Sequence, residues 1–282
     1  MHTTLISAAD LASAMAAQDI VVCDCRHDLL KPGWGREQYL AGHVPGAVYV
    51  DLGSDLSGPP LTDHGRHPMP SAQALQALFS RLGIGAGQQV VAYDQRDGSI
   101  AARLWWLLRY MGHDAVAVLD GGYPAWLAGE LPQRGGEETR APGRFEGVPR
   151  PDRVVVLADL PHVARLIDAR AAARYRGEVE PIDPAAGHIP GARNLPFADN
   201  VDATTGRFLP PQRVRTRLLE ACDGVAPADA VFACGSGVTA CHLALASAWA
   251  GLDESRIYVG SFSEWCRDPA RPVATGPEPG SL

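Results

Sequence analysis

The feature that most constrains the fold of this chain is an internal repeat. The sequence Gly-His-Val-Pro-Gly-Ala at residues 42–47 recurs as Gly-His-Ile-Pro-Gly-Ala at residues 187–192, 145 residues later. An apolar run that ends in Asp-Cys-Arg at residues 24–26 is likewise matched by one that ends in Asp-Ala-Arg at residues 168–170. Because the register is kept across such a long offset, the chain is expected to hold two similar domains in tandem.

Each half alternates strand-like and helix-like segments. Residues 90–94 and 230–234 are short apolar runs typical of buried strands, and each precedes a helical pattern that stops at a glycine, Gly112 or Gly251. This alternation predicts an α/β fold in which each domain is a mostly parallel sheet flanked by helices. Since the segment around residues 133–150 has no apolar period, we predict a first domain at residues 1–138, a linker at 139–152 and a second domain at 153–282.

Composition excludes several classes of function. The 282 residues carry 25 basic and 32 acidic side chains, a net charge of −7, without the basic cluster that nucleic acid or an anionic membrane requires. No run of about 18 apolar residues predicts a membrane span, and the first residues lack a targeting pattern, so a cytoplasmic protein is expected. Six cysteines are too few for a disulfide framework in a chain of this length, and since they form no Cys-x-x-Cys pair, no zinc site is predicted.

The strongest candidate for chemistry is Cys234, which follows the predicted strand at 230–234. The sequence Gly-Ser-Gly-Val-Thr comes next, at residues 235–239, and then a helical stretch begins. Glycines let the backbone curl so that several N–H groups point inward, and the helix end adds partial positive charge. Both effects favour a thiolate, so Cys234 is a candidate nucleophile; the alternative from the residues alone is a buried cysteine at a strand end.

The equivalent position in the first half is Asp94, 140 residues earlier. A carboxylate cannot accept sulfur, so the first half is predicted to be chemically silent.

Two other classes of protein match parts of this pattern. A cysteine phosphatase needs an arginine six residues after the cysteine to clamp phosphate, but Ala240 stands there and the loop is too short. A non-catalytic binding module suits the first half, where Asp94 replaces the cysteine, whereas the intact loop after Cys234 disfavours that class for the second half.

Taken together, these motifs resemble the two-domain sulfurtransferases of the rhodanese superfamily over essentially the whole chain. In the first half the resemblance rests on residues 24–26, 42–47, 65–68 (Gly-Arg-His-Pro), 103–106 (Arg-Leu-Trp-Trp) and 119–122 (Leu-Asp-Gly-Gly). In the second half it rests on residues 168–170, 174–177 (Arg-Tyr-Arg-Gly), 187–191 and 234–239. The resemblance implies two tandem rhodanese-like domains, of which the second is catalytic and forms a persulfide on its cysteine.

The resemblance also implies a donor and an acceptor of sulfur. A Cys-Gly-Ser-Gly-Val-Thr loop is similar to that of 3-mercaptopyruvate sulfurtransferases, whereas thiosulfate sulfurtransferases, the alternative, usually carry basic residues there. Sulfur would pass from the donor to Cys234 and then to a thiol, thioredoxin or cyanide. Neither a metal nor an organic cofactor is implied.

Specific roles follow residue by residue from the same resemblance. Ser236 and His67 match a proton relay beside the catalytic cysteine. Arg176 matches the arginine that binds the donor carboxylate in mercaptopyruvate enzymes, and Arg174 matches one that is important in thiosulfate enzymes. The backbone of the loop is expected to bind the transferred sulfur, through Gly235, Gly237, Val238 and Thr239.

The sequence departs from the mercaptopyruvate pattern in two places. A second carboxylate-binding arginine is expected shortly after Glu180-Pro181, where this chain has Ile182 and Asp183. The acidic member of the relay is expected at Gly53. The acidic residues nearby that could replace it are Asp51, Asp55 and Asp63.

The histidines of the repeated Gly-His turn, His43 and His188, are expected to be structural. They occur in both halves, and the silent half needs no catalytic histidine.

Overall fold

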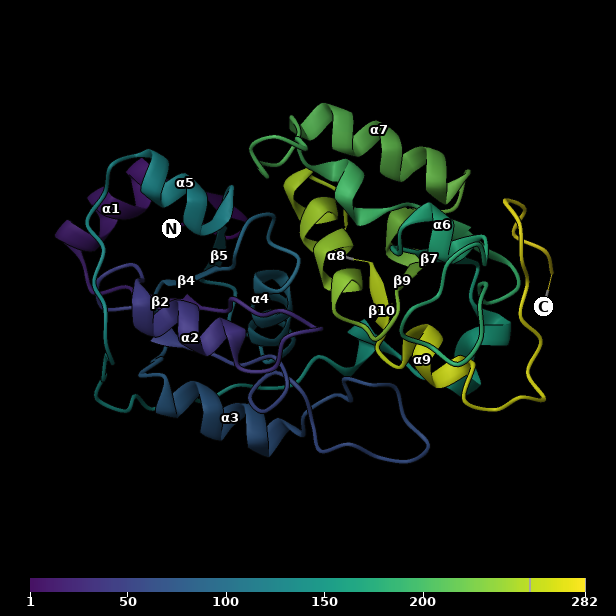
Figure 1. The fold of residues 1–282 in the computed structure, drawn as a ribbon, viewed down its shortest axis with the longest axis horizontal. Coiled ribbons are helices and arrows are strands. Elements are labelled where there is room, and N and C mark those ends of the chain that lie inside the picture. Colours follow the sequence, from purple (N-terminus) through teal and green to yellow (C-terminus); the bar gives the residue numbers. More distant parts are fainter. Residues whose placement is uncertain (254, 282) are drawn as a thin grey trace. The chain divides into compact units, whose positions relative to one another are not determined.

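The computed structural model describes residues 1–253 and 255–281. The chain divides into two compact units (Figure 1). The first unit comprises Met1–Gly58, Pro70–Arg150 and Asp202–Phe208. The second comprises Pro59–Met69, Pro151–Val201 and the chain from Leu209 onward.

The first unit is built on a five-stranded sheet with the order β1-β5-β4-β2-β3. All of its strand pairs are parallel. Its strands are β1 (Leu5–Ile6), β2 (Val21–Asp24), β3 (Val48–Tyr49), β4 (Val90–Tyr93) and β5 (Val116–Leu119). Its helices are α1 (Ala8–Ala17), α2 (Trp34–Ala41), α3 (Ala72–Arg81), α4 (Ala101–Tyr110) and α5 (Gly122–Ala128).

The second unit repeats this sheet with the order β6-β10-β9-β7-β8, again with parallel pairs only. Its strands are β6 (Val154–Val155), β7 (Arg165–Asp168), β8 (Ala192–Asn194), β9 (Ala230–Ala233) and β10 (Arg256–Tyr258). Its α-helices are α6 (Ala172–Tyr175), α7 (Pro211–Cys222), α8 (Thr239–Trp249) and α9 (Ser261–Trp265). Short 3-10 helices are η1 (Pro151–Arg153), η2 (Leu157–His162), η3 (Phe197–Asn200) and η4 (Pro227–Asp229).

The central strands are buried along their whole length, as expected for a parallel sheet covered on both faces. Every residue of β2, β4 and β9 is buried, and their sequences are rich in valine, alanine and aromatic residues. Leu119 and Trp126 complete the core of the first unit, while Tyr258 and Phe262 do so in the second. The prediction of two tandem domains with parallel sheets flanked by helices is therefore confirmed.

A buried ion pair follows the second strand of each repeat. Arg26 donates to both carboxylate oxygens of Asp24, and Arg170 does the same to Asp168. Each guanidinium also donates to a backbone carbonyl of the repeated Gly-His turn, at 2.6 Å and 2.7 Å. The pair ties the end of the strand to the turn in both repeats, because fork-shaped arginine can satisfy carboxylate and carbonyl together.

The histidines of the repeated turn are completely buried and make matching contacts. His43 stacks on Tyr39 with ring centroids 4.2 Å apart, and His188 stacks on Tyr175 at 3.7 Å. In both cases the Nδ1 atom lies 2.8 Å from the carbonyl oxygen of the stacked tyrosine. These contacts favour the structural role predicted for both histidines.

One connection in each repeat belongs to the unit formed mainly by the other repeat. Residues Pro59–Met69, here called the first strap, lie in sequence between β3 and α3 but group with the second unit. Residues Asp202–Phe208, the second strap, lie between β8 and α7 but group with the first unit. The first strap therefore supplies Arg66 and His67 to the unit that contains Cys234.

No helix within the described parts of the chain is long and apolar enough to cross a membrane.

Candidate active site

Cys234 lies where the centre of a parallel sheet meets a helix. It follows the last residue of β9 and begins the Cys234 loop (residues 234–238), after which α8 starts at Thr239. Its side chain is buried, with 2% of the residue exposed. The Sγ atom accepts a hydrogen bond of 3.1 Å from the Gly237 N–H, so the loop places a backbone donor beside the sulfur. A charged sulfur would be stabilised there by this donor and by the N-terminus of α8.

Glycine is required at the third position after the cysteine. Gly237 has φ +77°, and a Cβ atom at this place would collide with the Val259 carbonyl oxygen. The loop can therefore pack against the chain after β10 only with glycine at this position. Val238 and Thr239 complete the turn as the N-cap and first residue of α8.

Ser261 holds the backbone of Cys234 through its hydroxyl. Its Oγ atom accepts a 3.0 Å hydrogen bond from the Cys234 N–H and donates one of 2.9 Å to the Tyr258 carbonyl. Ser261 has φ +54°, a left-handed conformation that costs a serine about 1–3 kcal/mol. The corresponding residue of the first unit is Gly122, with φ +59°, for which this conformation carries no such cost.

The first strap brings His67 to the Cys234 loop. The Nδ1 atom of His67 lies 2.8 Å from Ser236 Oγ, the contact that the resemblance implied. The strap is fixed at two points that precede His67, because the Ser263 hydroxyl accepts from the Arg66 N–H at 3.1 Å and Arg267 donates to the Thr62 carbonyl at 2.9 Å. Ser236 is 6% exposed and His67 is half-buried, so the pair is partly shielded from solvent.

Three arginines surround Gly235, the residue directly after the cysteine. A Cβ atom built on Gly235 would lie 2.9 Å from Arg66 Nη2, 3.6 Å from Arg174 Nη1 and 3.8 Å from Arg170 Cδ. Glycine at this position thus lets guanidinium groups approach the loop. Burial is the main cause that lowers the pKa of Arg66, and the charge of Arg174 acts in the same direction.

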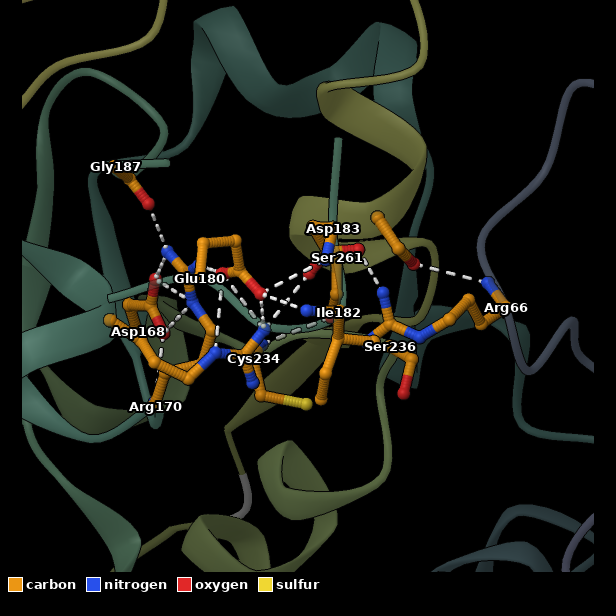
Figure 2. A network of polar contacts seen from close by, with 12 residues as sticks. Arg66, Asp168, Arg170, Glu180, Ile182, Asp183, Gly187, Cys234, Ser236 and Ser261 are labelled. Atoms are coloured by element: carbon orange, nitrogen blue, oxygen red, sulfur yellow. Dashed lines mark hydrogen bonds and ion pairs between the residues drawn. The ribbon is translucent and has the colours of Figure 1, made fainter. Parts of the chain in front are cut away.

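Carboxylates hold these arginines in place (Figure 2). Glu180 accepts from the Nε and Nη2 atoms of Arg174 and lies 3.5 Å from Arg170 Nη1. Asp183 accepts from Arg174 Nη2 at 3.0 Å through one oxygen and from Arg66 Nη1 through the other. Their side chains are only 3% and 1% exposed, so this is a buried ion network beside the candidate nucleophile.

The structure separates the two arginines that the sequence named for donor binding. Arg174 lies on α6 and faces Gly235, as described above. Arg176 is the C-cap of the same helix, and its guanidinium donates to Glu178 at 2.6 Å and 2.9 Å near the surface. Binding of the donor by Arg176 stays a prediction and requires this arginine to leave Glu178.

The three acidic residues named for the relay have other partners in the structure. Asp51 accepts from the backbone N–H groups of residues 53 and 54, and Asp55 pairs with Arg81. Asp63 lies on the first strap, 80% exposed, with its carboxylate 2.9 Å from His64.

Sequence reasoning did not place Arg66, Glu180, Asp183 or Ser261 in the site. Arg66 stands next to His67 in the Gly-Arg-His-Pro motif, which was the available signal for it. The other three become visible only when strand ends and loops are brought together.

Four of the other five cysteines lie in surroundings that disfavour ionisation. Burial raises the pKa of the Cys23 thiol to about 12 and raises that of Cys25, Cys222 and Cys266 as well. Cys241 lies on α8 and donates to the Gly237 carbonyl at 3.2 Å. Cys234 is distinguished from them by its place in the loop described above.

The Asp94 loop (residues 94–100) of the first unit shows how this framework holds an anion. Asp94 follows β4 and is completely buried. One carboxylate oxygen accepts from the N–H groups of Arg96 and Gly98, both at 3.0 Å. The other accepts from Ile100 at 2.8 Å and Ala101 at 3.0 Å. The turn between a central strand and its helix is therefore a ring of N–H donors, filled here by a carboxylate.

Comparison with known proteins agrees with the geometry. A family model for the rhodanese-like domain matches residues 7–129 and again residues 152–268. Over 280 residues the chain is 45% identical to a Pseudomonas aeruginosa protein named "Probable 3-mercaptopyruvate sulfurtransferase", with 96% of this chain and 98% of the relative covered. Over 284 residues it is 39% identical to a Mycobacterium tuberculosis protein named "Putative thiosulfate sulfurtransferase SseB", with 96% and 97% covered.

A solved structure is similar over nearly the whole chain. This is 3-mercaptopyruvate sulfurtransferase from Leishmania major, with a TM-score of 0.85 and 28% identity, covering 95% of this chain and 76% of the other. The repeated sheets, the paired loops and these similarities lead to one conclusion: the chain belongs to the rhodanese-like domain family and carries two copies of the domain.

Proposed function

We propose that this protein is a sulfurtransferase that moves sulfur from 3-mercaptopyruvate to a thiol through a persulfide on Cys234. The observation that carries the proposal is the similarity of two loops. Cys234 accepts an N–H bond of 3.1 Å in its loop. In the equivalent loop of the first unit, four N–H groups donate to the buried carboxylate of Asp94. The names of the Pseudomonas and Leishmania relatives support 3-mercaptopyruvate as the donor.

In the first half-reaction the Cys234 thiolate attacks the sulfur of the donor. A bond forms between the two sulfurs, and the bond between sulfur and C3 of the donor breaks, with its electron pair going to C3. Protonation of the resulting enolate gives pyruvate, and the proton balance is met by the thiol proton of the donor. The persulfide that remains carries its charge on the outer sulfur, where loop N–H groups can stabilise it.

Ser236 and His67 supply the route for that proton. Their side chains lie 2.8 Å apart, within the reach required for general acid–base catalysis. The hydroxyl of Ser236 is one residue from Gly235 and two from the nucleophile, so it can pass a proton between the donor and the imidazole. A donor whose leaving group needs no proton, such as thiosulfate, depends less on this pair.

In the second half-reaction an acceptor removes the outer sulfur. A thiolate attacks it, the S–S bond of the persulfide breaks, and the electron pair returns to Cys234 as a thiolate. Small thiols, reduced thioredoxin and cyanide are all nucleophiles of this kind. The reaction is therefore a double displacement without a metal or an organic cofactor.

The donor carboxylate is held by guanidinium groups beside the loop. Arg66 and Arg174 each direct one Nη atom at Gly235, and such groups match a carboxylate in shape and charge. Arg66 thereby fills the role of the second arginine expected after Glu180-Pro181. Arg176 joins them only if it exchanges Glu178 for the donor.

The experiment that tests this function is steady-state sulfur transfer with 3-mercaptopyruvate and thiosulfate compared side by side, using Cys234→Ser as the blank. We expect a higher kcat/KM with 3-mercaptopyruvate, and a mass increase of one sulfur atom on Cys234 when donor is added without acceptor. A higher kcat/KM with thiosulfate would favour the thiosulfate sulfurtransferase named for the Mycobacterium relative. No transfer from either donor would favour a non-catalytic binding module.

A further inference from the structure

The ion network beside Cys234 contains an acidic residue that the proposed chemistry does not use. Asp183 stands two residues after Pro181, in the loop that follows Glu180. Its side chain is 1% exposed and its two oxygens bind different arginines, Arg66 and Arg174. Because a buried carboxylate is costly unless its charge is compensated, such placement calls for an explanation.

The guanidinium groups of Arg66 and Arg174 each bind a carboxylate on one side and face Gly235 on the other. Arg66 gives Nη1 to Asp183 and turns Nη2 toward Gly235. Arg174 gives Nε and Nη2 to the carboxylates and turns Nη1 toward the same glycine. Asp183 binds both Arg66 and Arg174. It therefore fixes the positions of the two Nη atoms that face Gly235, where the donor is proposed to bind.

The charges of the network also balance. Three arginines (Arg66, Arg170 and Arg174) are paired with three carboxylates (Asp168, Glu180 and Asp183). The loop itself, residues 235–239, contributes no cationic side chain. Apart from the thiolate, the immediate surroundings of Cys234 are therefore close to neutral, although three guanidinium groups lie there.

From this arrangement we infer that Asp183 determines the charge of the donor that the site accepts: it cancels one arginine charge and so favours a monoanionic sulfur donor over a dianion. The inference rests on the proposed function. A donor such as 3-mercaptopyruvate brings one carboxylate, which the two exposed guanidinium edges can bind. A dianion such as thiosulfate brings a second negative charge to a site where the proposed thiolate is already negative and the three arginines are each paired with a carboxylate.

Removal of the Asp183 charge should shift this preference. Over several ångströms at an effective dielectric constant of about 20, one additional unit charge changes the relative binding of a dianion and a monoanion by about tenfold or more. Asp183→Asn removes the charge and nearly keeps the shape, whereas Asp183→Glu keeps the charge and changes the shape. Glu146→Gln makes the same change of net charge at an exposed pair with Arg144 in the first unit.

The primary measurement is the ratio of kcat/KM for thiosulfate to kcat/KM for 3-mercaptopyruvate in each variant. Because both constants scale with the concentration of active enzyme, the ratio is independent of any loss of folded protein. We expect the ratio to rise about tenfold in Asp183→Asn and to stay within threefold of the native value in Asp183→Glu and Glu146→Gln. An unchanged ratio in Asp183→Asn, or an equal rise in Asp183→Glu, would overturn the inference.

A second measurement does not depend on sulfur transfer. The rates at which iodoacetate and iodoacetamide alkylate Cys234 are compared in the same variants, with Cys234→Ser as the blank for the other cysteines. Iodoacetate carries one negative charge and iodoacetamide none, so the ratio of their rates reports the local charge. The ratio should rise severalfold in Asp183→Asn alone, and a ratio common to all variants would contradict the role of Asp183.

The two measurements also separate the two proposals. If the native protein used neither donor, the proposed function would be wrong, and the alkylation ratio would still decide whether Asp183 sets the charge around Cys234.

Discussion

The Asp94 loop and the Cys234 loop are two versions of one structure, and the residue at the strand end makes the difference. Both follow the central strand of a parallel sheet, contain a glycine with φ near +78° (Gly98 at +79° and Gly237 at +77°) and lead into a helix. In the first, Asp94 fills the ring of N–H donors with its own carboxylate. In the second, the thiol of Cys234 is shorter and accepts from Gly237. In both units the residue at the strand end accepts hydrogen bonds from backbone N–H groups of its loop, four in the first unit and one from Gly237 in the second.

The side chain of Asp94 is similar in length to a persulfide formed on Cys234. Beyond Cβ, aspartate has a carbon and then oxygen, and a cysteine persulfide has sulfur and then sulfur. The carboxylate oxygens of Asp94 therefore reach about as far into their loop as the outer sulfur of a persulfide would reach in the other. The Asp94 loop therefore displays the arrangement that we propose for the persulfide in the Cys234 loop, and the residue at the strand end differs between the two loops on the same fold.

The surroundings of the two loops differ as well. The first strap places Arg66 and His67 at the Cys234 loop. The second strap meets the Asp94 loop at Arg96, which donates to the Ala203 carbonyl and contacts Gly206. The first strap thus brings the side chains of Arg66 and His67 to the Cys234 loop. The second strap instead brings backbone atoms to the Asp94 loop.

Cys234→Ser should have the largest effect on this comparison. We expect sulfur transfer to fall by at least about 1,000-fold, because a serine hydroxyl cannot accept sulfur. The free energy of unfolding should change by less than about 1 kcal/mol, since one small atom is exchanged for another on a loop. Activity assays and urea unfolding of the same preparation measure both quantities; a large loss of stability would instead make Cys234 a structural residue.

The sequence predicts the two loops well, but it predicts poorly which side chains surround them. Strand ends, loops and the identity of Asp94 and Cys234 follow from the repeat, because hydrophobic runs and glycines are local signals. The roles of Arg174 and Arg176 do not follow, since two residues on a helix differ by about 200° in direction and only packing decides which one faces the loop. Asp183 and Ser261 reach the site through long-range packing that no local pattern shows.

Asp94→Ala should be the most destabilising change at either loop. It leaves four N–H groups in a buried turn without their acceptor, which should lower the free energy of unfolding by about 3 kcal/mol. Cys234→Ala is the matched variant and should cost about 1 kcal/mol, because one N–H group loses its acceptor. Urea unfolding compares the two, and equal losses would mean that Asp94 does not fill its loop as an anion.

The effect of Asp94→Ala should also depend on pH. Burial raises the pKa of Asp94 above its ordinary value of 3.8, although the backbone N–H bonds act in the opposite direction. A group whose pKa is raised in the folded state binds protons more tightly there, so its contribution to stability increases as the pH falls through the folded pKa and is complete below about 3.8. The difference in unfolding free energy between the native protein and Asp94→Ala should therefore be larger at mildly acidic pH than at pH 7, as measured by urea unfolding at both.

His67→Gln should separate the two donors by a smaller factor. With 3-mercaptopyruvate the enolate must be protonated, so loss of the imidazole beside Ser236 should lower kcat by about 100-fold. With thiosulfate the leaving group is sulfite, which needs no proton, and the loss should be under about tenfold. Steady-state kinetics with both donors measures this contrast, and Ser236→Ala should reproduce it; equal losses with both donors would assign His67 to binding or packing.

Substitutions of Ser261 should have the smallest effect of those considered. The left-handed backbone of this serine lowers the stability of the fold, while its hydroxyl positions the Cys234 amide. Ser261→Gly gives the second unit the residue that the first unit has at Gly122, relieving the left-handed conformation while removing the hydroxyl that accepts from the Cys234 N–H. Relief of strain and loss of the hydrogen bond nearly cancel, so the free energy of unfolding should change by less than about 1 kcal/mol. Ser261→Ala loses the hydroxyl and keeps the strain, so it should be less stable than Ser261→Gly by about 1 kcal/mol.

In both variants kcat should fall about tenfold while KM changes little, because the loop still forms but the Cys234 amide is no longer held. If Ser261→Gly kept full activity, the serine would be a packing residue, and the unfavourable conformation at this position would have no function in catalysis.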